Sequence, residues 1–214
     1  KFLKKDGHEI GVHSSFHDIL CKYNYAQQFE QIFIATNVHK LLLSENPKIF
    51  RAPNFSINHD SIAILEKLGY EIDSSVLPGR KHLAIPNFSE RLLTFYLPNI
   101  RTGMIPTYFD FSKAPINSYF PSKLDVSKEG SSSVLEIPVA SNISYKGIPI
   151  SGGSLKKYGL EKDIKAIDSY LGDYVVLVYH PWEFIKLNDN QEVFDEKLFD
   201  DFQSIIDHCI EKHS

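Results

Sequence analysis

The sequence predicts an α/β fold in which parallel strands are wrapped by helices. Short apolar segments with the character of buried strands alternate with longer segments whose apolar residues repeat at helical spacing. Glycine, proline and asparagine stand at many of the junctions between them. This alternation is typical of an open doubly wound sheet and also of a (β/α) barrel. The pattern alone leaves both architectures open.

Length and charge narrow the class of protein. At 214 residues, with 43% hydrophobic and 13% aromatic residues, the chain can bury a sizeable core, and we expect one domain over residues 1–214. A net charge of −4 gives no basic stripe, so we expect no nucleic-acid partner. Cys21 and Cys209 are expected as small apolar residues. No apolar run in the visible chain is long enough for a membrane span, and both a cytoplasmic and a cell-envelope location stay open.

The first third of the chain contains the clearest alternation. Strands are expected at residues 9–12, 48–50 and 70–76, and helices at residues 25–44 and from Asn58 to Gly69. Asn58 can cap the second helix and Gly69 can end it. In the first helix we expect an apolar face of Phe29, Ile32, Phe33, Leu41, Leu42 and Leu43.

The regular pattern breaks down over about residues 77–133, where prolines punctuate short aromatic-rich runs. We expect an excursion of hairpins and loops there, because a structureless loop of that length is uncommon in a compact domain. Its aromatic residues could line a sugar-binding rim, but packing against the rest of the domain is the favoured interpretation. They are Phe95, Tyr96, Tyr108, Phe109, Phe111, Tyr119 and Phe120.

Order returns in the last third. We expect strands at residues 134–139 and 174–179, a tight turn at 150–154, and helices at 163–171 and 194–213. Ile164, Ile167 and Leu171 should face inward from the first of these helices, and Leu198, Phe202, Ile205 and Cys209 from the second.

Four stretches contain residues that could bind a metal ion or take part in catalysis. They are Gly7–His17, Arg51–Ile57, Gly69–Val76 and Val178–Glu183. In the first, His13 and His17 stand four apart, so one helical turn would place both imidazoles on one face within reach of one metal ion. In this order the stretches resemble the polysaccharide deacetylase family, also called the NodB-homology domain or carbohydrate esterase family 4.

The resemblance implies a distorted (β/α) barrel of the NodB type, with its site at the carboxyl ends of the strands. It also implies hydrolysis of N-acetyl groups from a glycan or polysaccharide. The family begins with a strand that ends in two aspartates, and this sequence has no such strand before His13. We therefore expect the chain to be truncated at its N-terminus, without that strand and its helix.

For the metal, the resemblance assigns His13 and His17 as ligands. The ion would be divalent, most plausibly zinc, with cobalt, manganese and nickel as alternatives. The other histidines are not assigned to the metal. His8 is expected to be hydrogen-bonded or partly exposed, and His39, His59, His82, His208 and His213 to be solvated.

For catalysis, the resemblance assigns four further positions. Arg51 matches the arginine that orients a catalytic aspartate. The backbone amide of Asn54 would stabilise the oxyanion of the tetrahedral intermediate. His180 matches the general acid, and Asp73 the carboxylate that raises the basicity of that histidine, although a capping or turn role for Asp73 is equally open.

Three residues are expected at the substrate. Pro53 would fix the backbone before Asn54, Val178 would form a wall for the acetyl methyl group, and Trp182 would provide a platform for the sugar. Trp182 could instead close the barrel. Two other functions stay open, namely a catalytically inactive carbohydrate-binding domain and a hydrolase of a small amide on the same fold.

Overall fold

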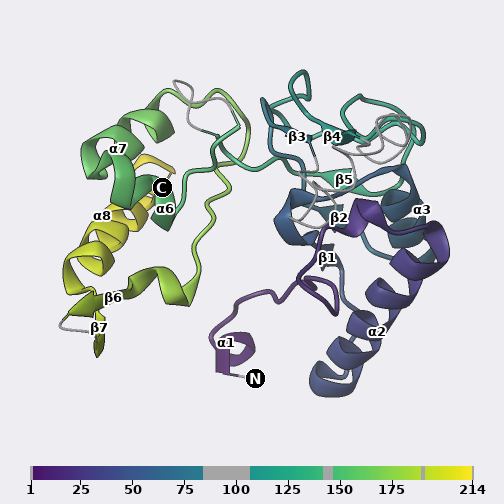
Figure 1. The fold of residues 1–214 in the computed structure, drawn as a ribbon, viewed down its shortest axis with the longest axis horizontal. Coiled ribbons are helices and arrows are strands. Elements are labelled where there is room, and N and C mark those ends of the chain that lie inside the picture. Colours follow the sequence, from purple (N-terminus) through teal and green to yellow (C-terminus); the bar gives the residue numbers. More distant parts are fainter. Residues whose placement is uncertain (1, 84–106, 142–146, 189–190, 214) are drawn as a thin grey trace, which may run out of the picture.

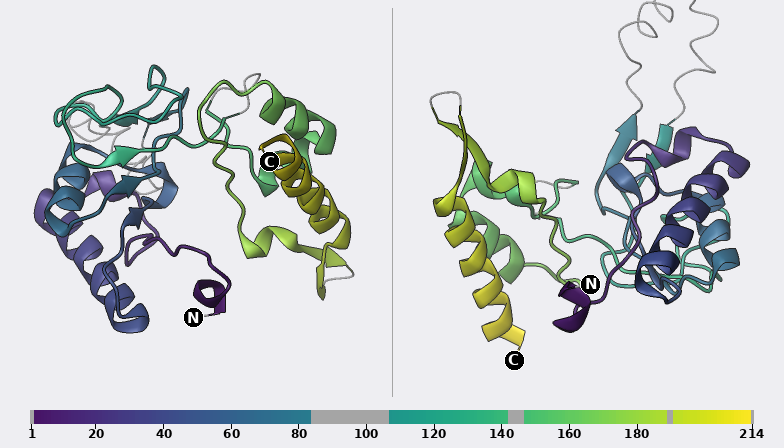
Figure 2. Two further views of the ribbon diagram at one scale, coloured as in Figure 1. Left: turned by 180° about the vertical axis from the view of Figure 1, so that it is seen from behind. Right: turned by 90° about the horizontal axis from the view of Figure 1, so that it is seen from below.

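The computed structural model of the chain describes residues 2–83, 107–141, 147–188 and 191–213 (Figure 1). Its elements form two groups that lie side by side (Figures 1 and 2). One group contains the described elements between residues 25 and 136, and the other contains those between residues 152 and 213. A cluster of Leu77, Val139 and Val178 packs residues from both groups together.

A small parallel sheet organises the N-terminal group. Its strands β1 (Ile49–Phe50), β2 (Ile72–Asp73) and β5 (Leu135–Glu136) pair in the order β1-β2-β5. Val12 adds a parallel bridge to Phe50 on the outer side of β1. The α/β class with a parallel sheet is therefore confirmed, while no strand among the described residues closes this sheet into a barrel.

Two capped helices cover this sheet. α2 (Tyr25–Leu43) begins at Asn24, and α3 (His59–Leu68) begins at Asn58, whose side chain accepts a hydrogen bond from the backbone of Ser61. Gly69 ends α3 with a φ of 81°, a conformation that glycine adopts without steric cost. The caps at Asn58 and Gly69 are thus confirmed.

The predicted inner face of α2 was partly wrong. Ile32 is fully buried, but Phe33, Leu41 and Leu42 are 42%, 82% and 57% exposed. The buried face also carries Gln28, Gln31, Thr36 and His39. Apolar residues surround this helix on several sides, so their spacing does not single out the face that packs. The polar residues are accommodated by hydrogen bonds, such as Thr36 Oγ1 to the Tyr70 hydroxyl at 2.7 Å.

The predicted excursion contains an antiparallel pair, β3 (Lys81–Leu83) with β4 (Thr107–Asp110). Phe109 and Phe111 are buried and stack at 4.6 Å between ring centroids, and Tyr119 is buried as well. The packing interpretation is confirmed for these three, whereas Phe120 is 49% exposed. Phe95 and Tyr96 lie outside the described residues.

The remaining elements are short except for the last helix. They are α1 (Phe2–Lys5), the 3-10 turns Leu20–Lys22, Pro53–Phe55 and Pro181–Phe184, α6 (Gly152–Tyr158), α7 (Leu160–Asp168), β6 (Ile185–Asn188), β7 (Gln191–Phe194) and α8 (Glu196–His213). Ile167 of α7 and Leu198 and Ile205 of α8 are buried together. The closing helix and its inner face are therefore confirmed.

Three expectations for this region were wrong. Residues 150–154 start α6 rather than form an isolated turn, because Ser151 caps the helix through the backbone of Ser154. Residues 174–179 form no strand ladder, since only Val178 makes a bridge, to Ser151. α7 ends at Asp168, and Leu171 beyond it is 80% exposed.

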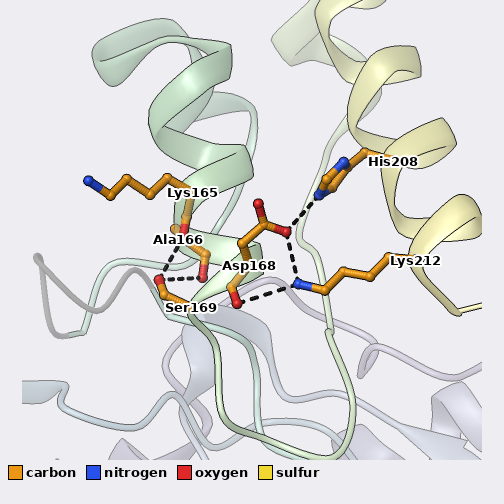
Figure 3. A network of polar contacts seen from close by, with 6 residues as sticks. All are labelled: Lys165, Ala166, Asp168, Ser169, His208 and Lys212. Atoms are coloured by element: carbon orange, nitrogen blue, oxygen red, sulfur yellow. Dashed lines mark hydrogen bonds and ion pairs between the residues drawn. The ribbon is translucent and has the colours of Figure 1, made fainter.

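Polar contacts join α7 to α8. Asp168 at the end of α7 accepts contacts of 2.8 Å each from His208 Nε2 and Lys212 Nζ of α8 (Figure 3). His208 therefore has a structural partner and is not merely solvated. His39 is a second correction, because it is buried with 7% exposure.

Candidate active site

The carboxyl ends of the parallel segments bring several of the predicted residues together. Arg51 N–H donates to the Val12 carbonyl at 2.9 Å, which places His13 and Arg51 at neighbouring strand ends. Ser74 follows β2 at the same edge, and its hydroxyl donates to the Ile137 carbonyl beyond β5 at 2.8 Å. Strand ends of a parallel sheet are where α/β proteins place their sites.

His13 and His17 lie close to each other, but not on a helix. Ser14 has a φ of 61°, so the backbone between the two histidines follows a loop and the expected helical turn was wrong. Their ring centroids are nonetheless 5.3 Å apart. His13 Nδ1 lies 2.8 Å from the Arg51 carbonyl oxygen, so it must carry the proton and leave Nε2 as the acceptor.

The neutral form of His13 is favoured by its surroundings. Although part of the ring faces solvent, desolvation by the surrounding chain lowers the pKa of His13. The hydrogen bond to the Arg51 carbonyl opposes this effect. Positive charge on His17, Arg51 and His180 lowers the pKa further, which also shows that His180 reaches the same electrostatic environment. A neutral imidazole is the form that binds a metal.

This pair fits two positions of a metal site. The Nδ1 contact of His13 to a backbone carbonyl is the arrangement that orients metal-binding histidines in general. Within the described ranges, no group of three His, Cys, Asp or Glu residues is arranged to hold a metal ion. The structure therefore offers two imidazole ligands and no complete ligand set.

The segment after Arg51 makes a sharp turn. Pro53 starts a 3-10 turn, and both Asn54 and Phe55 adopt left-handed conformations with φ of 55° and 58°. Such values are unfavourable for a residue like phenylalanine and are found where the surrounding structure imposes them. Ser56 fixes the turn, because its hydroxyl donates to the Pro53 carbonyl at 2.6 Å. Asn54 is thus presented on a rigid backbone next to Arg51.

Arg51 is held by the strand end of β2. Its Nε donates to the Ser74 carbonyl and its Nη2 to the Ser74 hydroxyl, each at 2.8 Å. Desolvation lowers the pKa of Arg51, and the negative charges of Asp73 and Glu136 oppose this shift. An arginine keeps its charge in proteins, so the guanidinium is a fixed cation at the sheet edge.

Asp73 lies in a buried carboxyl cluster beneath Arg51. Asp73 and Glu136 are both fully buried, and Asp73 Oδ1 accepts a hydrogen bond from the Ser75 hydroxyl at 2.6 Å. Glu136 Oε1 accepts one from the backbone of Val76 at 2.9 Å. Burial raises the pKa of both carboxyl groups, and most strongly that of Glu136, which Asp73 raises further. Of the two carboxyl groups, Glu136 is therefore the one that more readily keeps its proton.

His180 is held by its own neighbours. Its ring stacks on Trp182, with centroids 4.3 Å apart and planes inclined by 25°. The carboxylate beside its Nδ1 is that of Glu183, at 3.3 Å. Trp182 is 62% exposed, so one of its faces can receive a ligand, whereas Val178 is largely buried against Leu77 and Val139.

Comparison with known proteins identifies the first part of this arrangement. Residues 1–72 match the sequence profile of the Polysaccharide deacetylase family. Over these residues the chain is similar to the polysaccharide deacetylases. The matched region contains His13, His17, Arg51, Pro53 and Asn54, and it ends before Asp73.

Two similar proteins agree with this relationship. Peptidoglycan deacetylase-like protein FGM2 of Gibberella zeae is 30% identical over 76 residues, which are 36% of this chain and 22% of that protein. A crystal structure from Mycobacterium smegmatis, assigned as a polysaccharide deacetylase, aligns with 96% of this chain and 58% of its own chain. Its TM-score is 0.55 at 14% identity, which shows a shared fold.

Two residues near the candidate site were not predicted from the sequence. Glu136 was seen only as part of a strand, and Glu183 only as a residue that could pair with some cation. The signal for Glu136 is a lone charge inside the apolar run 134–139, since charges are almost never fully buried without a partner. For Glu183 the signal is its position three residues after His180, at the spacing of a capping residue.

Proposed function

We propose that this chain supplies the catalytic region of a metal-dependent hydrolase that removes N-acetyl groups from a polysaccharide or glycan of the cell surface. The observation that carries the proposal is the placement of His13, His17 and Arg51 at the strand ends, within electrostatic reach of His180. The relationship of residues 1–72 to polysaccharide deacetylases supports it. Closure of the parallel sheet into a distorted barrel is part of the same proposal.

His13 and His17 are the residues that would hold the metal. His13 would bind through Nε2, because its Nδ1 is occupied by the Arg51 carbonyl. Imidazole ligands suit zinc, which we place first, and also cobalt, manganese and nickel. A bound ion of this kind polarises an amide carbonyl and increases the acidity of water.

Arg51, Pro53 and Asn54 would form the side of the site that receives developing negative charge. The guanidinium of Arg51 is oriented by its two bonds to Ser74, so it can hold a carboxylate in a fixed position. Pro53 and the left-handed Asn54 fix the backbone on both sides of the Asn54 amide, which is the proposed donor. A backbone N–H at this place would stabilise the oxyanion of the tetrahedral intermediate, and loss of one such donor typically costs about 3 kcal/mol.

His180 would act on the opposite side as the general acid for the departing amine. Trp182 stacks on His180 and keeps an exposed face, which would support the sugar ring. Val178 would limit the space for the acetyl methyl group. Asp73 would keep its expected relation to His180. It would also act on Arg51, because its carboxyl group interacts electrostatically with that guanidinium.

The test combines metal content with acetate release. Elemental analysis of the protein that carries this chain should find one divalent metal per chain, and acetate should be released from chitin oligomers. Both should be lost in a His13→Ala, His17→Ala double variant and retained in His59→Ala, whose side chain is exposed on α3. Absence of metal from the wild type would overturn the proposal. Metal without acetate release would overturn the glycan substrate.

No helix among the described residues is long and apolar enough to cross a membrane. The size of the glycan substrate is tested by assaying soluble oligomers and polymer separately. Release from oligomers alone would point to a small glycan, and release from both would support the polysaccharide.

A further inference from the structure

The carboxylate of Glu183 contacts His180 in two places. Its Oε2 accepts a hydrogen bond of 2.7 Å from the backbone N–H of His180, and it lies 3.3 Å from Nδ1 of the same residue. The backbone N–H of Glu183 donates in return to the His180 carbonyl at 2.9 Å. With Trp182 stacked on the ring, the imidazole is fixed at one edge and on one face.

Room for this carboxylate is provided by a glycine of α6. A Cβ atom added to Gly152 would lie 2.7 Å from Glu183 Cδ and 2.8 Å from Oε2, closer than real Cβ contacts allow. The next residue differs, because a Cβ on Gly153 would meet its nearest atom, Ser151 Oγ, at 3.6 Å. Glu183 is therefore seated directly against the backbone at Gly152.

Backbone pairing between the segment before α6 and the segment before His180 brings α6 and His180 together. Val178 N–H donates to the Ile150 carbonyl at 3.0 Å, and Ser151 pairs with Val178 in parallel. α6 begins one residue after Ser151, and His180 comes two residues after Val178. The position of Gly152 beside Glu183 thus follows from the backbone pairing and not from a chance contact of side chains.

We propose that Glu183 is a positioning residue for His180. A carboxylate at Nδ1 selects the tautomer with the proton on Nδ1, so Nε2 is the nitrogen that exchanges a proton with the substrate. When the doubly protonated ring acts as the acid, the Nε2 proton passes to the departing amine nitrogen and the Nδ1 proton stays at Glu183. The reaction rests on the proposed function, but the orientation of His180 does not.

This inference gives Glu183 the direct contact with His180, in addition to the relation to that histidine that the resemblance implies for Asp73. Asp73 is engaged with Ser75 and Glu136 in the buried cluster. His13 and Tyr179 also interact electrostatically with the pair, His13 with His180 and Tyr179 with Glu183. The test leaves His13 and Tyr179 unchanged. Its variants alter only the position or the charge of the Glu183 side chain.

The matched variants are Gly152→Ala and Gly153→Ala. Both replace a glycine in α6 by a residue with higher helix propensity, so neither should weaken the helix itself. Only the first displaces Glu183. We expect NMR of isotope-labelled imidazole nitrogens to show His180 as the Nδ1–H tautomer in wild type and Gly153→Ala, and as a tautomer mixture in Gly152→Ala.

Activity provides the second readout. In Gly152→Ala we expect kcat to fall by roughly 10- to 100-fold with KM almost unchanged, because misplacement of a catalytic group by about 1 Å has this effect. Glu183→Gln preserves size and removes the charge, so it should also shift the tautomer equilibrium of His180. If Gly152→Ala fails to fold, Glu183→Gln alone tests the positioning role of Glu183.

An unchanged His180 tautomer in both Gly152→Ala and Glu183→Gln would overturn the positioning role. So would a Gly153→Ala variant that behaves like Gly152→Ala. Because the NMR readout needs neither metal nor substrate, it stands even if the wild type releases no acetate. A failure of the proposed function is thereby distinguished from a failure of this inference.

Discussion

Replacement of Glu136 by glutamine should change the pH dependence of stability in a defined direction. In the folded protein, burial raises the pKa of Glu136 well above its ordinary value of 4.5, and Asp73 raises it further. The folded chain therefore keeps a proton that the unfolded chain releases above the ordinary carboxyl range. The stabilisation is fully present below the unfolded pKa and is lost as pH rises toward the folded pKa.

The magnitude follows from linkage. While one proton is held by the folded state only, the free energy of unfolding falls by at most about 1.4 kcal/mol per pH unit. Between pH 5 and pH 7, wild type can therefore lose up to about 3 kcal/mol in the free energy of unfolding through this pair. Arg51 reduces the loss, because its positive charge favours the ionised carboxyls. A glutamine has the shape of Glu136, can still accept from Val76 N–H, and can donate to Asp73 without titrating.

The measurement is urea unfolding of wild type and Glu136→Gln from pH 5 to pH 8. Wild type should lose stability relative to the variant as pH rises, so the variant should be the more stable protein at the upper end. Glu71→Gln is the control, because Glu71 pairs with Lys48 at the surface and should change stability by less than about 1 kcal/mol. An identical pH slope in wild type and Glu136→Gln would refute the raised pKa of Glu136.

Three further predictions concern the frame of the site. Gly69→Ala should cost about 1 kcal/mol in the free energy of unfolding, because the added Cβ meets no atom within 4 Å and only the φ of +81° is strained; no change in urea unfolding would contradict this. Ile205→Ala, at a fully buried position of α8, should cost about 2–5 kcal/mol, whereas Ile210→Ala on the same helix is 61% exposed and should stay within about 0.5 kcal/mol. Asp168→Asn should weaken the α7–α8 contact with His208 (Figure 3) slightly at low salt, and a thermal unfolding difference that persists at high salt would argue against an electrostatic cause.

The parts of the fold that the sequence predicts are those with local causes. Asn58 and Gly69 mark the ends of α3 because capping and the left-handed conformation are properties of those residues themselves. The strand order and the inner face of α2 depend on contacts between distant segments. Thr36 is buried because Tyr70 supplies a partner for its hydroxyl from a segment 34 residues away, and no periodicity within α2 records that contact.

Residues 174–179 show the same limit for strands. Their valines and tyrosines have high strand propensity, but a strand needs a partner for its backbone groups. Among the described residues of this segment, Val178 pairs with Ser151 and Ile150, and the Val176 carbonyl accepts a hydrogen bond from Ala140 N–H at 3.1 Å, which is too little for a strand ladder. Strand propensity therefore located correctly the extended segment that leads to His180. It overestimated how regular that segment is.

The site residues that the sequence predicts, such as His13 and Arg51, lie together because their backbone segments pair. The residues that it misses, Glu136 and Glu183, are fully or largely buried carboxylates. His13 and Arg51 lie together because Val12 and β1 pair in parallel, which any alternating α/β pattern with these motifs would lead one to expect. Glu136 is fully buried and Glu183 is largely buried beside His180, and a carboxylate in such a place is costly unless a donor faces it. Each of them accepts a backbone N–H, from Val76 and from His180 respectively. A backbone donor does not depend on side-chain type, so the sequence can mark Glu136 and Glu183 as unusual carboxylates, but it does not show which N–H each of them accepts from.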